Sequence, residues 1–380
     1  MDKYQKPQGS LISFFSNKVK QYGGINFAQG IPGFQPPSQL MESLKNLTHS
    51  NIHQYAPGIG NHKLLALLEN NYSKVGNVGL DNFLILQGAT EAISLVYTYL
   101  LNLENSPMQV VAFDPVYESY NNLPAIFKND FTALKLGPDN KIDTDTLEQT
   151  LKKFDRGIIF LNSPGNPYGR IISKDEVIAV HNLAHKYNYY IIFDAVYKDL
   201  YFKNPPYIPL DILDDRIFYV NSFSKMLSIT GWRIGYLICS PSHMKKIRSI
   251  HDYIGLCAPS ILQEAIASYL SENNYGMEYV IDIREKLLKS FDQLSESLKN
   301  YGFKIPPVDG GYFIWSELPE NMDDGFKFSI DLYDEVKVAT IPGIHFSSYG
   351  KRFVRFNVAR EESELNEGIE KIDLFFKNIK

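Results

Sequence analysis

Cysteine is scarce in this sequence, and long apolar runs are missing. Only two cysteines, Cys239 and Cys257, occur in 380 residues. They are too few for the disulfide framework of a small secreted protein and lack the spacing of a metal-ligand set. No segment reaches the roughly 20 uninterrupted apolar residues of a membrane-spanning helix, and the first residues lack the apolar stretch of a signal peptide. These absences predict a cytoplasmic protein with no membrane partner.

An excess of charge of one sign is also missing. The 43 acidic residues nearly balance the 38 basic ones and leave a net charge of −5, so no basic surface for nucleic acid is expected. The sequence has no internal repeat and no strained Gly-x-Ser-x-Gly turn that would carry a serine nucleophile. A chain of this length can bury a large core and is expected to divide into two lobes.

Metal-binding patterns are equally weak. His181 and His185 lie four residues apart in a helical pattern over residues 174–187, so their imidazoles share one helical face, as in a zinc half-site. The glutamate that follows the first histidine in zinc-protease helices is absent. The pattern therefore favours a surface pair of histidines, and no metal is expected.

What the sequence does contain is a regular alternation of apolar runs and helical stretches. The apolar runs, which predict buried strands, occupy residues 83–87, 109–113, 156–161, 189–193, 216–220 and 234–239. Such an alternation predicts a mostly parallel sheet that is covered by helices on both faces. Ligands of these sheets bind beyond the carboxyl ends of the strands. The candidate residues that should converge there are Tyr117, Asn166, Asp194, Tyr197 and Lys225.

Lys225 stands in a segment of small and hydroxyl residues, 221–235, between two of the apolar runs. Lysine amines form Schiff bases when desolvation or nearby cations lower their pKa from its usual value of about 10.4. Neighbouring serines and Arg233, eight residues on, could bind a phosphate. The pattern indicates a lysine that binds pyridoxal phosphate, and a loop lysine that faces solvent is the alternative.

Two further features fit such a cofactor. The turn Gly88-Ala89-Thr90 joins a strand to a helix, where free backbone N–H groups can bind one phosphate, although many such turns bind nothing. Asp194 ends an apolar strand, and a buried carboxylate needs a cation or hydrogen-bond donors. A protonated pyridine nitrogen is such a partner; a helix N-cap is the alternative for Asp194.

The terminal regions predict a smaller lobe. Helices are expected at residues 10–22, 273–300 and 365–379, strands at 312–315 and 352–359, and a Gly/Pro-rich loop at 30–37. Ser38 is expected to cap the next helix. Alternation within 352–359 places Arg355 on one face between hydrophobic residues, where it suits carboxylate binding. Arg352 and Arg360 are expected to face solvent.

The ordered set of motifs resembles the class I pyridoxal-phosphate-dependent aminotransferases of fold type I. The motifs are Gly88-Ala-Thr-Glu-Ala92, Asn162-x-Pro-x-Asn166-Pro-x-Gly169, Asp194-x-x-Tyr197, Ser222-x-Ser224-Lys225 and Gly231-x-Arg233. A finer resemblance to the methionine, glutamine and kynurenine (aromatic) aminotransferases rests on Gln54–Pro57, Phe113–Tyr120 and Gly310–Phe313. The resemblance covers nearly the whole chain. Tyr168 departs from it, because the family often has threonine or serine there.

The resemblance implies a role for each of the central residues. Lys225 would form the aldimine with pyridoxal phosphate and then carry a proton during catalysis. Asp194 would pair with the ring nitrogen, and Asn166 and Tyr197 would hydrogen-bond the ring oxygen. Tyr117 would stack on the ring face.

The resemblance also assigns the residues around the phosphate and the substrate. Those implied at the phosphate are Gly88, Ala89, Thr90, Ser222, Ser224 and Arg233. Tyr55 would reach the phosphate of the other subunit in a homodimer with shared active sites. Arg355 would bind the substrate carboxylate, with Gly30 and Asn166 nearby.

The implied fold is α/β. A large cofactor-binding domain at residues 46–275 would contain a mostly parallel sheet of the seven-stranded type, covered by helices. A smaller α+β domain would be formed by residues 1–45 and 276–380.

The implied activity is a ping-pong transfer of an amino group from an L-amino acid to a 2-oxo acid. Residues 250–260 contain Asp252 and apolar residues but no arginine for a second carboxylate, although Arg248 lies just upstream. A neutral substrate such as methionine, an aromatic amino acid or glutamine is therefore expected. A carbon–sulfur β-lyase, a decarboxylase and an aspartate aminotransferase remain alternatives on this scaffold, whereas a regulator would need an added DNA-binding module.

Overall fold

The computed structural model describes residues 4–378, so the predicted helix end at Ile379 lies outside the described residues. Its main feature is a seven-stranded sheet in the order β2-β8-β7-β6-β5-β3-β4. The strands are β2 (Phe83–Leu86), β3 (Gln109–Asp114), β4 (Phe131–Lys135), β5 (Gly157–Asn162), β6 (Tyr189–Asp194), β7 (Ile217–Ser222) and β8 (Gly235–Ile238). Only β8 runs antiparallel to its neighbours. The predicted mostly parallel α/β sheet is confirmed.

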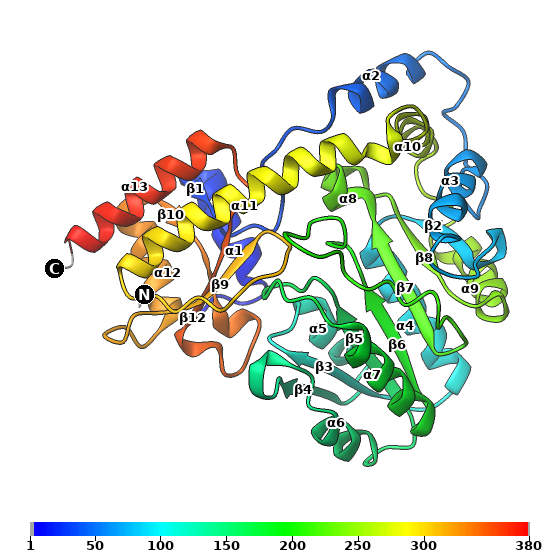
Figure 1. Ribbon diagram of the computed structural model, residues 1–380, viewed down its shortest axis with the longest axis horizontal. Coiled ribbons are helices and arrows are strands. Elements are labelled where there is room, and N and C mark those ends of the chain that lie inside the picture. Colours follow the sequence, from blue (N-terminus) through cyan, green and yellow to red (C-terminus); the bar gives the residue numbers. More distant parts are fainter. Residues whose placement is uncertain (1–3, 379–380) are drawn as a thin grey trace.

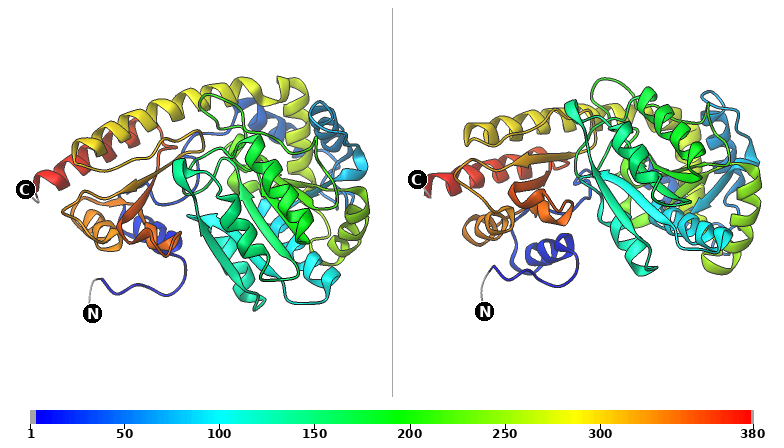
Figure 2. Two further views of the ribbon diagram at one scale, coloured as in Figure 1. Left: turned by 60° about the horizontal axis from the view of Figure 1, so that its bottom comes forward. Right: turned by 90° about the horizontal axis from the view of Figure 1, so that it is seen from below.

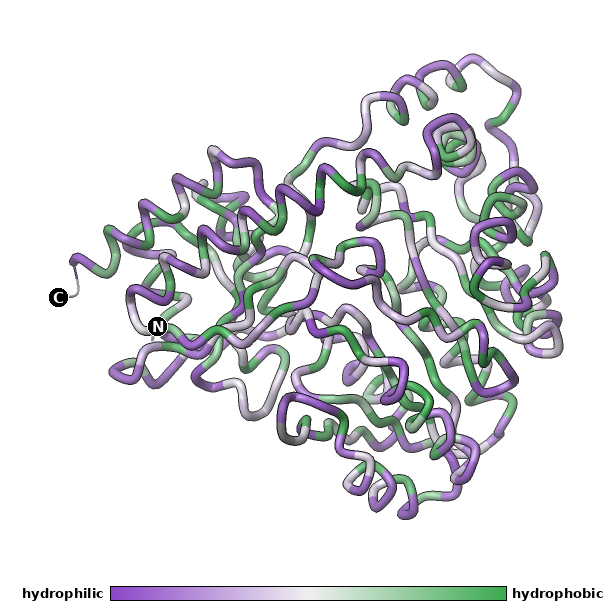
Figure 3. The backbone as a smooth tube through the Cα atoms, in the orientation of Figure 1, coloured by the Kyte–Doolittle hydropathy of each residue, from purple (hydrophilic) through white to green (hydrophobic). Residues whose placement is uncertain are grey.

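Helices cover both faces of this sheet (Figures 1 and 2). One face packs against α4 (Ala89–Glu104), α5 (Glu118–Ile126) and α9 (Pro241–Ile254). The other face packs against α3 (His62–Tyr72), α6 (Thr144–Leu151), α7 (Lys174–Lys186) and α10 (Ser260–Glu272). Because both faces are covered, the central strands β5 and β7 are almost entirely buried. Figure 3 shows green, hydrophobic stretches in the strands of this sheet.

The two ends of the chain meet in a smaller lobe. Its three-stranded antiparallel sheet contains β9 (Phe313–Glu317), β11 (Ile341–Pro342) and β12 (Phe353–Asn357), and a two-stranded parallel sheet joins β1 (Ile25–Asn26) to β10 (Val338–Ala339). These strands pack with α1 (Leu11–Tyr22), α12 (Gly325–Val336) and α13 (Glu362–Asn378).

The long helix α11 (Met277–Asn300) passes from the large sheet to the smaller lobe (Figure 1). The predicted helix began at residue 273, but Tyr275 has a φ of 56°, which breaks the helical geometry before Met277. Helix α2 (Ser38–Leu47) lies across the predicted domain boundary at 45/46, and its Leu40 packs in the core of the large sheet. The division into a large domain at residues 46–275 and a smaller one at 1–45 and 276–380 therefore remains a proposal.

Two local predictions are wrong. Ser38 is the first residue of α2 rather than its cap, because the preceding Pro37 occupies the N-cap position and offers no side-chain acceptor. Arg360, expected in solvent, is 5% exposed, and its Nη2 lies 3.4 Å from the carbonyl oxygen of Gln29. The 30–37 loop also lies against it, since a Cβ atom on Gly33 would lie 3.1 Å from its Nη1. These contacts between distant segments were invisible in the alternation of one strand. Within residues 4–378, no helix is long and apolar enough to cross a lipid bilayer.

Candidate active site

A pocket opens at the carboxyl ends of β5, β6 and β7, where the large sheet meets the smaller lobe. Twelve residues that the sequence singled out line it: Gly30, Ala89, Thr90, Tyr117, Asn166, Asp194, Tyr197, Ser222, Ser224, Lys225, Arg233 and Arg355. They come from both ends of the chain and from several helices, strands and loops between. Gly88 does not line the pocket but packs against Arg233, which does. Tyr55 lines a different groove.

Lys225 lies in the short helix α8 (Phe223–Met226), directly after β7. Its ammonium donates a hydrogen bond of 2.8 Å to the carbonyl oxygen of Gly30, which also accepts one of 2.9 Å from the Tyr312 hydroxyl. The Nζ atom lies 5.8 and 5.7 Å from the ring centroids of Tyr197 and Tyr312. Lys225 therefore points into the pocket and not to solvent.

Asp194 ends β6 and is 4% exposed. Its Oδ2 accepts a 2.7 Å hydrogen bond from Tyr120, and its Oδ1 accepts one of 3.2 Å from the backbone N–H of Val196. Burial raises the pKa of Asp194 to about 6, although Tyr120, Val196 and the charge of Lys225 oppose the rise. A cation within hydrogen-bonding distance would stabilise the ionised form that burial disfavours.

The anion-binding end of the pocket is built where α4 begins. Gly88 precedes the helix with a φ of 83°, and a Cβ atom there would lie 2.5 Å from Nη2 of Arg233. The guanidinium thus packs directly against a backbone that only glycine allows. The hydroxyls of Ser222 and Ser224 lie 2.7 Å apart beside it. Ala89 and Thr90 are the first two residues of α4, whose N–H groups have no partner within the helix, so a phosphate group fits here.

Arg355, on β12, is fully buried on the opposite side of the pocket. It donates to Asn166 Oδ1 at 2.8 Å and to the carbonyl oxygen of Ala28 at 2.6 Å. Its guanidinium carbon lies 4.2 and 4.6 Å from the ring centroids of Phe313 and Phe346. Burial lowers the pKa of Arg355 to about 10, and its Nε has no hydrogen-bond partner among the described residues. An unpaired buried donor of this kind suits a carboxylate ligand.

Two tyrosines line the same pocket. Burial raises the pKa of both Tyr117 and Tyr197, so both hydroxyls stay protonated at neutral pH and can donate hydrogen bonds. The ring of Tyr117 meets that of Tyr120 edge-on at 5.6 Å.

Several residues that entered the sequence argument do not line the pocket of this chain, among them Asp252, Tyr55 and Arg248. Tyr55 is 81% exposed and lines a separate surface groove with Gln87 and Leu256. Nη2 of Arg248 donates at 2.8 Å to the carbonyl oxygens of both Leu80 and Phe83.

Sequence reasoning assigned no role to three residues that shape the pocket: Tyr120, Asn162 and Tyr312. Asn162 accepts a 2.8 Å hydrogen bond from the N–H of Asn166 and donates one of 3.0 Å to the carbonyl oxygen of Asp194. Tyr120 follows Tyr117 by one helical turn, and this spacing was the available signal. The contacts of Tyr312 depend on how the smaller lobe is placed, which no local pattern shows.

A family model for "Aminotransferase class I and II" matches residues 22–372. The chain belongs to this aminotransferase family. It is 28% identical over 374 residues to a "Probable N-acetyl-LL-diaminopimelate aminotransferase" of Bacillus subtilis, covering 96% of this chain and 93% of the relative. It is also 28% identical to a "Probable aspartate aminotransferase" of Methanocaldococcus jannaschii, covering 91% of each.

A solved structure from Escherichia coli, whose title identifies a methionine aminotransferase function, is also similar to this aminotransferase. The TM-score is 0.88, with 25% identity, 98% of this chain covered and 99% of the other. The family and its fold depend on pyridoxal phosphate. The pocket fits that group, because an anion site, a lysine and a buried carboxylate surround one cavity.

Proposed function

We propose that this aminotransferase moves the amino group of a neutral L-amino acid to a 2-oxo acid. Methionine, aromatic amino acids and glutamine are the substrates we favour. The observation that carries the proposal is the composition of the pocket wall. Among the described residues its cations are Lys225, Arg233 and Arg355. Lys225 and Arg233 are assigned to the cofactor, so Arg355 alone is left to bind a carboxylate of the substrate.

Bound pyridoxal phosphate supplies an aldehyde that captures amino groups and a ring that accepts electrons. Lys225 would hold the group through its Nζ, and the same amine can take a proton from the substrate Cα. Asp194 would hold the group by pairing its carboxylate with the protonated ring nitrogen. Asn166 and Tyr197 would hold it by donating hydrogen bonds, and Tyr117 would pack against it and exclude water.

The two ends of the bound molecules are held by separate arginines. Arg233, with Ser222 and the amides at the start of α4, binds the phosphate. Arg355 binds the substrate carboxylate through its guanidinium, oriented by Asn166 and by the aromatic rings above and below it. The reacting Cα is thereby fixed between Arg355 and Lys225.

The remaining wall does not suit a second carboxylate. It contains Ile12, Ile31 and Glu118. Nε2 of His345 lies 3.0 Å from Glu118, and the Ser10 hydroxyl donates to it at 2.8 Å. Although burial alone raises the pKa of Glu118, these two partners and the charge of Arg355 together outweigh burial and lower it. Glu118 is thus an anion at neutral pH and repels a substrate with a distal carboxylate.

Arg248 could have supplied a clamp for that carboxylate. Its hydrogen bonds to Leu80 and Phe83 hold it at the far end of β2 in its own chain. Breaking both would leave two carbonyl groups without their donor, which opposes a movement toward another active site.

The experiment is to compare kcat/KM for methionine, phenylalanine, glutamine and aspartate with one 2-oxo acid acceptor. We expect each neutral substrate to exceed aspartate by tenfold or more, about 1.4 kcal/mol in the transition state. Glu118→Gln should raise kcat/KM for aspartate, while Glu362→Gln, an exposed change far from the pocket, should not. If wild-type enzyme prefers aspartate tenfold, the proposed specificity is wrong, although the aminotransferase assignment stands.

A further inference from the structure

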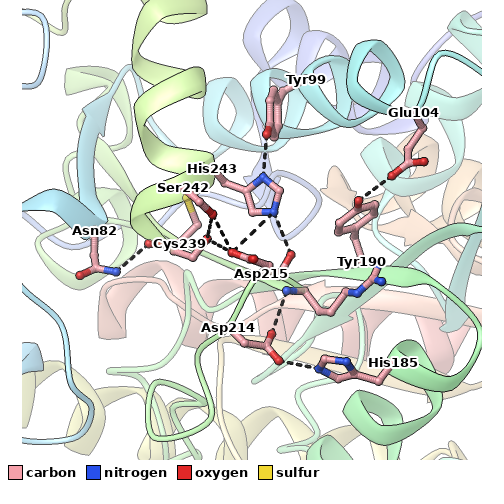
Figure 4. Close-up of polar contacts among 12 residues, drawn as sticks. Asn82, Tyr99, Glu104, His185, Tyr190, Asp214, Asp215, Cys239, Ser242 and His243 are labelled. Atoms are coloured by element: carbon pink, nitrogen blue, oxygen red, sulfur yellow. Dashed lines mark hydrogen bonds and ion pairs between the residues drawn. The ribbon is translucent and has the colours of Figure 1, made fainter.

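Three potential metal ligands meet outside the active site. His181 and His185 lie on α7, and Asp214 lies in the loop that leads into β7. The ligand atoms of these residues all lie within 4.8 Å of one another. Figure 4 shows His185 directed at the carboxylate of Asp214.

Local structure aims all three side chains at one point. The histidines are four residues apart on α7, so they share a face, and their rings meet edge-on with centroids 4.7 Å apart. Asp214 accepts the backbone N–H of Arg216 at 2.8 Å through Oδ1. That bond leaves Oδ2 for the imidazoles, whose Nε2 atoms lie 2.9 Å (His181) and 2.5 Å (His185) from it.

The free oxygen of the Asp214 carboxylate, Oδ2, is directed at the two imidazoles. Its neighbour Asp215 faces elsewhere: Oδ1 of Asp215 accepts a 2.7 Å hydrogen bond from Ser242, as Figure 4 shows. One carboxylate and two imidazoles therefore face a common point.

We propose that His181, His185 and Asp214 form a binding site for a divalent transition-metal ion, with Zn²⁺ as its best fit. Two imidazole nitrogens and a carboxylate oxygen are common zinc ligands, at about 2.0–2.2 Å from the metal. A tetrahedral arrangement with these bonds separates the ligand atoms by about 3.3–3.5 Å. An ion thus enters if each Nε2 retreats from Oδ2 by about 0.5–1 Å.

The exposure of the two histidines permits that movement. The side chain of His181 is 13% exposed and anchors the site, whereas that of His185 is 50% exposed and can turn outward. The open side next to His185 provides an entry path and leaves the fourth position to water. The ion takes the place of the hydrogen-bonding contacts between the imidazoles and the carboxylate.

The location gives the site a stabilising function. Helix α7 ends at Lys186, just before β6 begins, and Asp214 lies just before β7, so the cluster lies at the amino ends of these strands. The candidate active site lies at their carboxyl ends. A bound ion would connect α7 to the far end of the long segment between β6 and β7. It would raise thermal stability and leave the cofactor pocket unchanged.

The histidine pair by itself predicted no metal, and this inference revises that expectation. The third ligand follows His185 by 29 residues. It joins the pair only because β6 and β7 are neighbours in the sheet.

The test uses the full chain with its cofactor bound, without an affinity tag and after treatment with a chelator. Isothermal titration with ZnCl₂ should give one saturable equivalent and an increase in the melting temperature. His185→Ala and Asp214→Asn should each weaken binding by about tenfold or more, with little change in melting temperature before zinc is added. His62→Ala removes an exposed histidine elsewhere and should leave the titration unchanged.

Two outcomes would overturn the proposal. One is the absence of saturable zinc binding by the wild-type chain. The other is equal affinity in wild type, His185→Ala and Asp214→Asn, which would place the ion elsewhere. The cofactor absorbance of each variant, recorded in parallel, separates loss of the metal site from damage to the active site.

Discussion

At the scale of single residues, burial shifts two charged groups of the pocket, Asp194 and Arg355, toward their neutral forms. Burial raises the pKa of Asp194 to about 6 and lowers that of Arg355 to about 10. A pyridinium nitrogen and a substrate carboxylate would each supply the missing opposite charge. The pocket is therefore least stable electrostatically when it is empty, and its ligands relieve that cost.

The first prediction concerns pH and Asp194 in the cofactor-free chain. Its pKa is about 6 in the folded chain against 3.8 as the ordinary value, so the folded state binds more protons between these values. Stability should therefore fall as pH rises from 4 to 6, by on the order of 3 kcal/mol. Asp194→Asn should lack that part of the fall, as urea unfolding at several pH values would measure. Parallel pH profiles for the two proteins would contradict the prediction.

The second prediction concerns Arg355. Arg355→Lys keeps the charge but loses the planar fork, so KM for the amino acid should rise by about 10- to 100-fold. The matched control is Arg352→Lys, at the margin of the same strand, where the side chain meets Glu317 outside the pocket. Steady-state kinetics would measure both. If the control raises KM as much as Arg355→Lys does, carboxylate binding is not the function of Arg355.

At the scale of elements, the start of α4 combines a strained backbone position with an arginine from a distant turn. Gly88→Ala would place a methyl group where Nη2 of Arg233 now lies. We expect Arg233 to be displaced and the affinity for pyridoxal phosphate to fall by about tenfold or more. Titration of the cofactor-free chain, followed by absorbance, measures the change.

Gly302→Ala is the matched control for that experiment. Gly302 has a similar φ of 88°, and its added Cβ would meet only Pro319, at 3.6 Å. Both substitutions bear the backbone strain of a positive φ, but only Gly88→Ala disturbs the anion site. Equal loss of cofactor affinity in the two variants would show that strain alone is responsible.

At the scale of the whole molecule, an exposed apolar surface surrounds Tyr55. Tyr253 is 92% exposed, Ile254 62% and Leu256 45%, and Leu256 lines the same groove as Tyr55. Large side chains of this kind, gathered on one face, mark an interaction surface. We propose that two copies of the chain meet there and share their active sites, with Tyr55 serving the other subunit.

The prediction is that two inactive variants restore each other. Tyr55→Ala and Lys225→Ala should each lose most or all activity, because each lacks a group that every site needs. Mixed and refolded together, they should form heterodimers in which one site has both intact residues, and activity should return. Sedimentation as a monomer, or no recovery in dimers shown to be mixed, would contradict shared sites.

Much of this protein could be read from its sequence because the information was local. Alternating apolar runs and helices predicted the parallel sheet, and the residues that follow the strands predicted which side chains converge. Arg355 could be placed by the alternation of its own strand. No helix was predicted at α5, where Pro124 lies inside a helix that continues to Ile126.

Tertiary structure decided the rest, because contacts between distant segments have no local signature. The burial of Arg360 depends on the 30–37 loop, and the hydrogen bond between Lys225 and Gly30 joins residues 195 positions apart. The pKa of Asp194 depends on how completely the pocket excludes water. Asp214 likewise meets His181 and His185 only through the order of the strands. Residue types determined the available chemistry; packing decided which groups meet and how strongly they lose their contact with water.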